Sequence, residues 1–407
     1  MARTKIALVT PTLSELGGVP NVVDFIFRTL QKSGDFEIAI ISLATSSRDA
    51  ASVRIADPRT WLRSPLIQRR LWIGREYLHV GAWWTEIELQ RYKPRRILTE
   101  ALNQYDLVQV VAGTPAFAYV TAPVKVPVCL FVATTIAQDR EPRLRQMTGW
   151  RKAWLLLMTG FNRQIERWVL RHTAYIFAES EYTQQLLSPY VPAGKLHLGP
   201  PGVDTDFFKP REQYCKDGYL VTVGRLADPR KNVRLLLTAY HQLRQQLAGA
   251  PKLVLVGHSG LAPADQEYTA ALGLTEFIEM HLDVSTEQLC TLYRKAALFV
   301  LSSDEEGLGI VILEAMACGL PVISTDCGGP ATAIQPGITG LLTPVGDSAA
   351  LAQAMLDLLQ NPERRRSMGQ AGRAVIEQHF SLEAAGKVYL DTYAELLARR
   401  AAGQRQE

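Results

Sequence analysis

The sequence predicts a two-domain α/β protein in which each domain is built on a doubly wound parallel sheet. Short apolar segments rich in β-branched residues alternate with longer amphipathic segments along most of the 407 residues. The short segments are apolar at nearly every position, which is typical of parallel strands covered by helices on both faces. A stretch rich in proline and glycine, 191–210, separates two such series. We therefore expect domains at 1–195 and 206–380, followed by a helical segment at 381–407 that can pack back on the first domain.

Each expected strand is a short apolar run bounded by polar, glycine or proline residues. In the first domain these runs lie at 5–11, 37–44, 107–113, 126–134 and 174–180. In the second domain they lie at 219–226, 252–259, 298–303, 321–326 and 340–344. Open α/β sheets bind ligands beyond the carboxyl ends of their strands, so the loops after these runs are the candidates for a functional site.

Composition limits the class of protein. Hydrophobic residues make up 47% and charged residues 21% of the chain, which fits a globular fold and excludes a disordered or fibrous one. No apolar run approaches the roughly 18–20 residues of a membrane-spanning helix, and the run near the start continues into a strand, so we expect no signal peptide. The five cysteines are scattered without a Cys-x-x-Cys pair. This pattern indicates a reducing compartment, cytoplasmic by default, and argues against structural zinc.

Two glutamates stand inside an otherwise apolar stretch, SSDEEGLGIVILEAMACGLPV (302–322). We expect a strand, then a loop that holds Glu306, then a helix that holds Glu314 and ends at Gly319. A glycine-bearing loop that enters a helix exposes backbone N–H groups and the positive end of the helix dipole, which suits phosphate. The carboxylates would then accept hydrogen bonds from sugar or ribose hydroxyls. The alternative is one solvated glutamate and one glutamate that interacts with the helix dipole.

A second loop carries basic residues. In VGRLADPRKN (223–232), Arg225, Arg230 and Lys231 follow an expected strand and precede an expected helix. Cations clustered at a strand end suit a diphosphate, which an arginine can hold through two parallel hydrogen bonds. A solvated basic turn is the alternative.

Two further motifs are less specific. Gly17 and Gly18 precede an amphipathic helix after the first expected strand, which makes them either a phosphate-binding helix start or a tight turn. They do not form the G-x-G-x-x-G fingerprint of nicotinamide enzymes. Asp204 and Asp206 form an Asp-x-Asp pair in the connector, and we expect no metal there because the pair does not follow a core strand.

Together these motifs resemble those of glycosyltransferase family 4. The resemblance rests on EEGLGIVILEAMACGLPVI (305–323), VGRL with RKN (223–232), PGVDTDFF (201–208) and GITGLLTPVGD (337–347). It is strong from about 174 to 347 and weaker over the first 50 residues. It implies the GT-B fold, in which two Rossmann-like domains face each other across a cleft. The first domain would bind the acceptor and the second a nucleotide-diphospho-sugar.

The resemblance also implies roles for individual residues. Arg225 and Lys231 would bind the donor diphosphate and stabilise it as a leaving group. Glu306 would accept hydrogen bonds from the donor sugar, and Glu314 would bind the ribose. Arg225, Lys231 and Glu306 would be the catalytic set. Backbone groups would complete the donor site, supplied by Gly307, Leu308 and Gly309 and, from the first domain, by Gly17 and Gly18.

The implied activity is that of a retaining hexosyltransferase that uses a UDP- or GDP-linked sugar. Its acceptor would be a glycan, a lipid-linked saccharide or a polysaccharide precursor. No metal or cofactor is implied, because fixed cations and a helix N-terminus stabilise the departing diphosphate. Two alternatives on the same fold stay open, a non-catalytic nucleotide-sugar-binding protein and a sugar-nucleotide epimerase. The chain departs from the family pattern at Thr134 and Thr135, where a histidine is frequent, and at Thr332, which replaces an acid.

The first half of the chain is basic and holds all seven tryptophans. Through residue 200 there are 25 Lys and Arg residues against 16 Asp and Glu residues. Two segments, 59–96 and 143–172, mix arginine, tryptophan and leucine, and in the second the apolar residues recur at helical spacing. Such a helix either lies in an anionic membrane interface, at the inner face of the membrane, or packs onto the sheet of its own domain. We expect no nucleic-acid partner.

Overall fold

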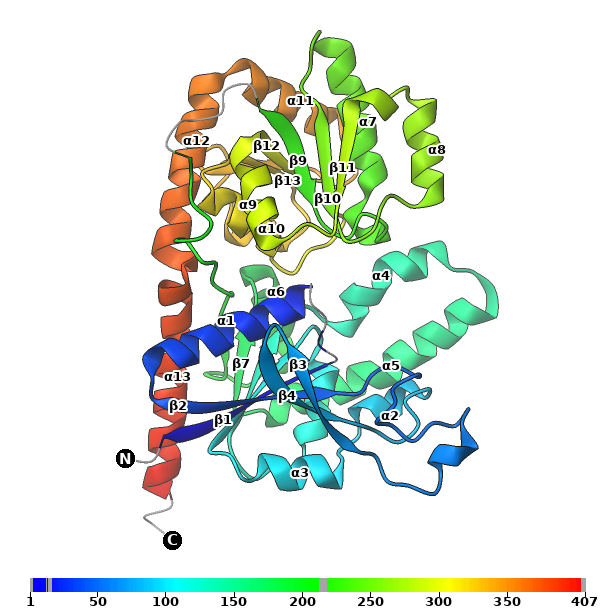
Figure 1. Cartoon of the computed structure of the whole chain (residues 1–407), viewed down its shortest axis with the longest axis vertical. Coiled ribbons are helices and arrows are strands. Elements are labelled where there is room, and N and C mark those ends of the chain that lie inside the picture. Colours follow the sequence, from blue (N-terminus) through cyan, green and yellow to red (C-terminus); the bar gives the residue numbers. More distant parts are fainter. Residues whose placement is uncertain (1–2, 12, 14–16, 212–217, 404–407) are drawn as a thin grey trace. The chain divides into compact units, whose positions relative to one another are not determined.

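The structure is a computed structural model of the chain, and it describes residues 3–11, 13, 17–211 and 218–403. The chain forms two compact units. Unit 1 comprises residues 1–201 and 385–407, and unit 2 comprises residues 202–384. Each unit is a sheet flanked by helices (Figure 1). None of the described helices combines the length and the apolar character needed to cross a membrane.

The sheet of unit 1 has the strand order β3-β4-β2-β1-β5-β6-β7-β8. All neighbouring strands are parallel except β3 and β4, which form an antiparallel pair at one edge. The strands are β1 Thr4–Pro11, β2 Phe36–Leu43, β3 Ile67–Trp72, β4 Arg75–Val80, β5 Leu107–Ala112, β6 Val128–Val132, β7 Tyr175–Ala178 and β8 Leu196–Leu198.

Helices cover both faces of this sheet. On one face, residues of α3, α5 and α6 join a single apolar cluster with the strands. On the other face, α13 supplies Tyr389, whose ring stacks on Phe177 of β7 at 4.3 Å between centroids, and Tyr393, whose hydroxyl donates to Gln109 Oε1 at 2.8 Å. The helices are α1 Gly18–Ser33, α2 Glu88–Tyr92, α3 Arg96–Leu102, α4 Ile136–Gln146, α5 Gly149–His172, α6 Glu181–Leu187 and α13 Leu382–Gly403, with short turns η1 Pro58–Thr60, η2 Pro115–Thr121 and η3 Ser188–Tyr190.

The sheet of unit 2 has the strand order β11-β10-β9-β12-β13-β14, and all of its strands are parallel. A parallel sheet of this kind needs a crossover helix after each strand, which the alternation in the sequence supplies. The strands are β9 Tyr219–Val223, β10 Leu253–Gly257, β11 Ile278–Leu282, β12 Ala296–Leu301, β13 Val322–Thr325 and β14 Gly340–Thr343.

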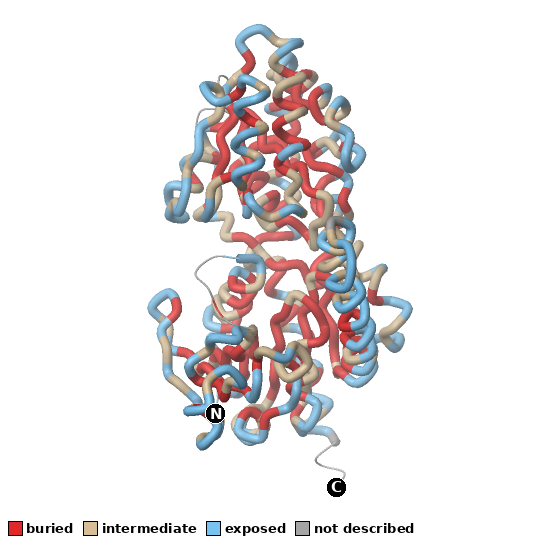
Figure 2. Tube along the Cα trace, turned by 90° about the vertical axis from the view of Figure 1, so that its right-hand side faces the viewer, coloured by how far each residue is buried: buried red, intermediate tan, exposed pale blue. Residues whose placement is uncertain are grey.

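Alternate residues of the central strands of unit 2 enter two different apolar clusters. Val221 and Phe299 point to the face covered by α9 and α10, whereas Leu220 and Leu298 point to the face covered by α7 and α11. Figure 2 shows buried residues running along the inside of each unit. The helices are α7 Val233–Gln246, α8 Pro263–Ala271, α9 Thr286–Lys295, α10 Ile310–Ala317, α11 Ser348–Gln360 and α12 Pro362–Val375, with short turns η4 Pro229–Lys231, η5 Thr275–Phe277, η6 Gly329–Thr332 and η7 Ile376–Phe380.

The predicted fold class is confirmed, and each of the predicted strands is present within a few residues of its expected bounds. Four further strands were not predicted. β3 and β4 carry charged residues at many positions, β11 is largely exposed at an edge, and β8 is a three-residue strand inside the predicted connector 191–210. All four lie at or next to an edge of their sheet, where burial on both faces is not required.

Candidate active site

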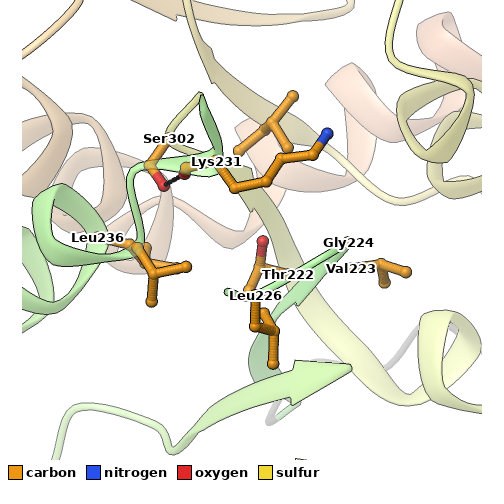
Figure 3. A pocket seen from close by; sticks show the side chains of 9 residues that line it. Thr222, Val223, Gly224, Leu226, Lys231, Leu236 and Ser302 are labelled. Carbon is orange, nitrogen blue, oxygen red and sulfur yellow. Dashed lines mark hydrogen bonds between the residues drawn. The ribbon is translucent and has the colours of Figure 1, made fainter. Parts of the chain in front are cut away.

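The carboxyl ends of β9 and β12 form the topological switch point of unit 2. From β9 the chain adds β10 and β11 toward one edge of the sheet, then returns to add β12 on the other side of β9, where the strand order reverses. Open α/β sheets bind their ligands in the crevice at such a point. A small pocket lies here, and Lys231 extends across it (Figure 3). Its lining residues are Thr222, Val223, Gly224, Leu226, Lys231, Val233, Leu236, Leu301 and Ser302.

Lys231 and Glu306 form an ion pair at this pocket, between the loops that follow β9 and β12. Lys231 Nζ donates to Glu306 Oε1, and the same oxygen accepts a hydrogen bond from Ser303 Oγ at 2.6 Å. Only 18% of the lysine side chain and 12% of the glutamate side chain is exposed. Burying either charge without a partner would cost free energy, so each of the two groups stabilises the other in this site.

The two arginines of the same loop lie differently. Arg225 is 65% exposed, and its guanidinium lies 2.9 Å from Asp228 Oδ2. Arg230 is more buried and pairs with Asp228 at 3.0 Å and with Glu305 at 3.6 Å. Burial alone would raise the pKa of Asp228, but the hydrogen bonds and charge of Arg230 hold it below its usual range. Arg230 therefore ties the loop together, whereas Arg225 faces solvent.

Hydrogen bonds between the two loops fix the position of Lys231. Ser302 Oγ donates to the carbonyl oxygens of Lys231 and Asn232 at 2.9 and 3.1 Å. Asn232 Nδ2 donates to Asp304 Oδ1 at 2.8 Å, and its Oδ1 caps α7 by accepting from Leu235 N at 3.2 Å. Asn232 has φ 42°, a left-handed conformation that asparagine tolerates better than most residues. The RKN sequence thus ends in the residue that both closes the turn and starts the helix.

The predicted phosphate loop, Gly307 to Gly309, runs directly into α10. Leu308 is buried in the core, and Gly309 has φ +83° and precedes α10 without a side-chain cap. The first N–H groups of a helix have no partner within the helix, and Gly309 at the N-cap position has no side chain to supply one. Gly329 packs against this loop so closely that an added Cβ would lie 2.3 Å from Gly307 O and 2.6 Å from Glu306 O.

Glu314 is buried on α10 and is directed toward α9. Tyr293 Oη donates to Glu314 Oε2 at 2.9 Å. Burial raises the pKa of this carboxyl from 4.5 to about 7, although the tyrosine hydrogen bond lowers it in part. The described hydrogen bond of Glu314 therefore goes to Tyr293 and not to the Lys231–Glu306 pair.

Other predicted residues lie elsewhere. Gly17 and Gly18 belong to unit 1, where Gly17 has φ +146° and its carbonyl accepts from Asn21 N at 3.1 Å at the start of α1. Their closure over a donor stays a prediction. Asp204 Oδ1 accepts from the backbone N–H groups of Asp206 and Phe207 at 3.1 and 3.0 Å, as in a turn. Among the described residues, no group of three or more His, Cys, Asp or Glu side chains is placed to hold a metal ion.

The sequence did not point to Ser303 and Tyr293. Ser303 precedes Glu306 by three residues, and a short hydroxyl at that spacing could have been read as a partner of the carboxylate. Tyr293 precedes Glu314 by 21 residues and lies on a different helix, so no local pattern marks it.

Two family models match the chain. The model described as glycosyl transferases group 1 matches residues 203–375, and the model described as Glycosyltransferase Family 4 matches residues 16–207. The chain belongs to glycosyltransferase family 4. The two matches meet near the boundary between the units, so this membership rests on both units of the family 4 chain.

Curated relatives align with part of this family 4 chain. The GDP-mannose-dependent alpha-(1-6)-phosphatidylinositol monomannoside mannosyltransferase of Mycolicibacterium smegmatis is 34% identical over 222 residues, which are 50% of this chain and 56% of the relative. The D-inositol 3-phosphate glycosyltransferase of Segniliparus rotundus is 32% identical over 216 residues, which are 50% of this chain and 47% of the relative. The chain therefore matches about half the length of these relatives.

Solved structures resemble the family 4 chain along nearly its whole length. Sucrose-phosphate synthase from Thermosynechococcus elongatus has a TM-score of 0.74 at 20% identity, covering 98% of this chain and all of that one. HepE of Anabaena in complex with UDP has a TM-score of 0.69 at 15% identity, covering 96% of this chain and all of that one. At these identities the likeness shows a shared GT-B fold, which confirms that prediction.

The positions where this family 4 chain lacks a histidine lie at the carboxyl end of β6. Thr134 N donates to Gly113 O at 2.9 Å, and the Thr134 side chain is largely buried. Thr135 Oγ1 caps α4 by accepting from Gln138 N at 3.4 Å. Both threonines therefore take part in holding the loop between β6 and α4.

Proposed function

We propose that this chain is a retaining glycosyltransferase that moves a hexose from a nucleotide-diphospho-sugar to an acceptor. The observation that carries the proposal is the Lys231–Glu306 ion pair at the switch point of unit 2. A lysine already held in a mostly dry site is positioned before the substrate arrives, and such fixed charges stabilise developing negative charge better than water does. Family membership supports the same conclusion.

In the proposed reaction the donor diphosphate lies between Lys231, Arg225 and the N-terminus of α10. The bond between the sugar C1 and the diphosphate oxygen breaks, and the charge that develops on that oxygen is stabilised by the two cations and the helix dipole. The acceptor oxygen bonds to C1 on the same face that the diphosphate leaves. The proton of the acceptor hydroxyl passes to an oxygen of the departing diphosphate, which leaves as a nucleoside diphosphate.

The two glutamates act on hydroxyl groups in this proposal. Glu306 accepts hydrogen bonds from the donor sugar while it keeps Lys231 in place. Glu314 binds the ribose and is supported from behind by Tyr293. The backbone N–H groups of Gly307, Leu308 and Gly309 contribute to holding the phosphates, and the loop of Gly17 and Gly18 in unit 1 contributes to the donor site.

The relatives suggest which donor and acceptor to test first. One of them is named as GDP-mannose-dependent and as acting on a phosphatidylinositol monomannoside. We therefore propose a GDP- or UDP-linked hexose as the donor, with GDP-mannose as the first to test, and a lipid-linked saccharide as the acceptor. The proposed location is cytoplasmic and peripheral, at the inner face of a membrane.

A ligand screen tests the donor site. Thermal unfolding is measured with UDP-, GDP- and ADP-sugars, because a ligand at 100 times its dissociation constant stabilises the folded state by about 2.7 kcal/mol. The matching nucleotide-sugar is expected to raise the melting temperature of the wild-type chain and to raise it less in Lys231→Ala. Lys252→Ala removes an exposed lysine just before β10, at the amino edge of the same sheet, and should respond like the wild type.

Turnover tests the reaction. With the donor found in the screen, Lys231→Ala is expected to lower kcat about 100-fold or more, the loss that follows removal of one preorganised donor of positive charge. Glu306→Gln should also lower kcat, because the amide leaves Lys231 without its charged partner. Donor binding without transfer to any acceptor would favour the non-catalytic binding protein. Turnover at the wild-type rate in both variants would remove the proposed site.

A further inference from the structure

The outer face of α5 is an exposed aromatic surface. Four large apolar residues on it are half to three-quarters exposed: Trp150 75%, Trp154 59%, Leu157 53% and Phe161 51%. Their spacings of four, three and four residues place them on one stripe of the helix. Monomeric proteins seldom leave such a continuous apolar surface to water without a use for it.

The stripe is not needed to attach α5 to unit 1. A different side of the helix is buried, and two polar side chains on it are hydrogen-bonded to other elements. Asn162 Nδ2 donates to Glu88 Oε1 of α2 at 2.6 Å, and Glu166 Oε1 accepts from Ile136 N at the start of α4 at 3.0 Å. The buried residues are Met158, Thr159, Asn162, Glu166, Val169 and Leu170.

Positive charge accompanies the stripe. The helix carries Arg151, Lys152, Arg163, Arg167 and Arg171, and its single acidic residue, Glu166, is on the buried side. At 3.6 residues per turn, Arg151 and Arg171 are the exposed cations that flank the stripe, and Arg151 lies 5.7 Å from the centroid of the Trp150 ring. Lys152 and Arg163 lie nearer the buried side of the helix. The outer face of α5 therefore presents aromatic rings flanked by cations, without a carboxylate of its own helix between them. Tryptophan and arginine in this combination suit a lipid interface, where the rings enter the boundary between headgroups and acyl chains and the guanidinium groups meet phosphates.

We propose that the outer face of α5 is the surface by which this chain docks on an anionic membrane. The helix lies in the plane of the interface with Trp150, Trp154, Leu157 and Phe161 inserted, to a depth of roughly 5–10 Å. This inference deepens the proposed function, because it rests on an acceptor held in a membrane and names the surface that approaches it. If the stripe instead packs against a second copy of the chain, the membrane proposal is wrong.

Vesicle co-sedimentation of the full chain tests the apolar half of the proposal. The wild type is expected to bind vesicles rich in phosphatidylglycerol and to bind pure phosphatidylcholine vesicles much less. Trp154→Glu with Phe161→Glu should lower binding more than about tenfold, since it places charge where apolar contact is needed. Ile338→Glu makes the same kind of change at an exposed residue of unit 2 and should bind like the wild type.

Charge substitutions test the electrostatic half. Arg151→Gln and Arg171→Gln, at the two exposed cations beside the stripe, should each lower partitioning about fivefold and together about 25-fold, because each cation near an anionic surface contributes about the same attraction. Arg366→Gln, at an exposed position of α12 in unit 2, should have no effect. Added salt should weaken wild-type binding and reduce the difference between the variants and the wild type.

Three results would overturn the docking surface. These are no binding of the wild type to anionic vesicles, unchanged binding of the Trp154→Glu/Phe161→Glu variant, and a concentration-dependent dimer that this variant abolishes while vesicle binding persists. Failure of the proposed function is separable from these results. Lys231→Ala should lose turnover and keep vesicle binding, whereas the α5 variants should lose vesicle binding and keep turnover on a water-soluble acceptor.

Discussion

Replacement of Glu314 by glutamine should stabilise unit 2 at high pH and not at low pH. The carboxyl is buried on α10, and burial raises its pKa from 4.5 to about 7. The folded state therefore holds a proton that the unfolded chain releases, so stability is complete below about pH 4.5 and falls as the pH rises to about 7. At 1.36 kcal/mol for each pH unit, ionisation costs the folded state about 3 kcal/mol at pH 8 and less than about 1 kcal/mol at pH 5.

Glutamine removes this cost and keeps the contact with α9. Its side-chain oxygen can still accept the hydrogen bond from Tyr293, and its volume is nearly that of the acid. The Glu314→Gln variant should thus be more stable than the wild type by up to about 3 kcal/mol at pH 8, and the gain should shrink below about 1 kcal/mol at pH 5. Glu267→Gln, at an exposed site on α8, should show no such dependence on pH.

The chain offers separate probes for its two units. All seven tryptophans lie in unit 1, so tryptophan fluorescence during urea unfolding reports unit 1 alone. Native-state hydrogen exchange of peptides from α9 and α10 reports unit 2. The fluorescence transition should be the same in Glu314→Gln and in the wild type, whereas exchange from α9 and α10 should slow at pH 8. A variant that is less stable at pH 8, or a gain of equal size at both pH values, would refute the argument from burial.

Three further changes have defined outcomes. Gly329→Ala should lower the free energy of unfolding by about 1–3 kcal/mol and raise the KM for the donor, because the added Cβ would clash with the carbonyl oxygens of Gly307 and Glu306. Urea unfolding and kinetics measure the two effects. Gly260→Ala, where nothing lies within 4 Å of the added Cβ, is the control. Asn232→Ala should lower the free energy of unfolding by about 1–2 kcal/mol, because it removes the cap of α7 and places alanine at a left-handed φ. Asn232→Gly should lower it less, because glycine adopts a left-handed φ without strain and is acceptable at a cap position. Equal losses in the two variants would contradict this account. Donor affinity measured by calorimetry should rise from pH 6 to pH 8 as Glu314 ionises, because a carboxylate accepts hydroxyl hydrogen bonds more strongly than a carboxyl does. In Glu314→Gln the donor affinity should depend less on pH.

The fold could be predicted because its central strands are buried on both faces. The run that forms β12 contains no polar residue, which predicts a strand buried on both faces, and all six residues of β12 are buried. The antiparallel pair β3–β4 escaped prediction for the opposite reason. The strand IQRRLW has two adjacent arginines and an exposed leucine, which is acceptable at an open edge but does not resemble a core strand.

The candidate site was predictable where it follows from topology. Lys231 and Glu306 are 75 residues apart, but each comes after a central strand, and the carboxyl ends of neighbouring parallel strands meet at one edge. Spacing could not decide the direction of Glu314, because its partner Tyr293 belongs to a separate helix. Nor could spacing tell that the aromatic stripe of α5 faces outward, because an amphipathic pattern does not say which of its two sides a domain will cover.

The way in which α13 completes unit 1 has a consequence for the order of folding. Residues 3–201 leave the ribosome long before Tyr389 and Tyr393 are synthesised, and until then Phe177 and Gln109 lack the rings that cover them. Unit 2 is a continuous segment and has no such delay. Folding should therefore be completed in the reverse of the order of synthesis. Unit 2 is expected to finish folding first, and unit 1 is completed only when α13 packs on its sheet.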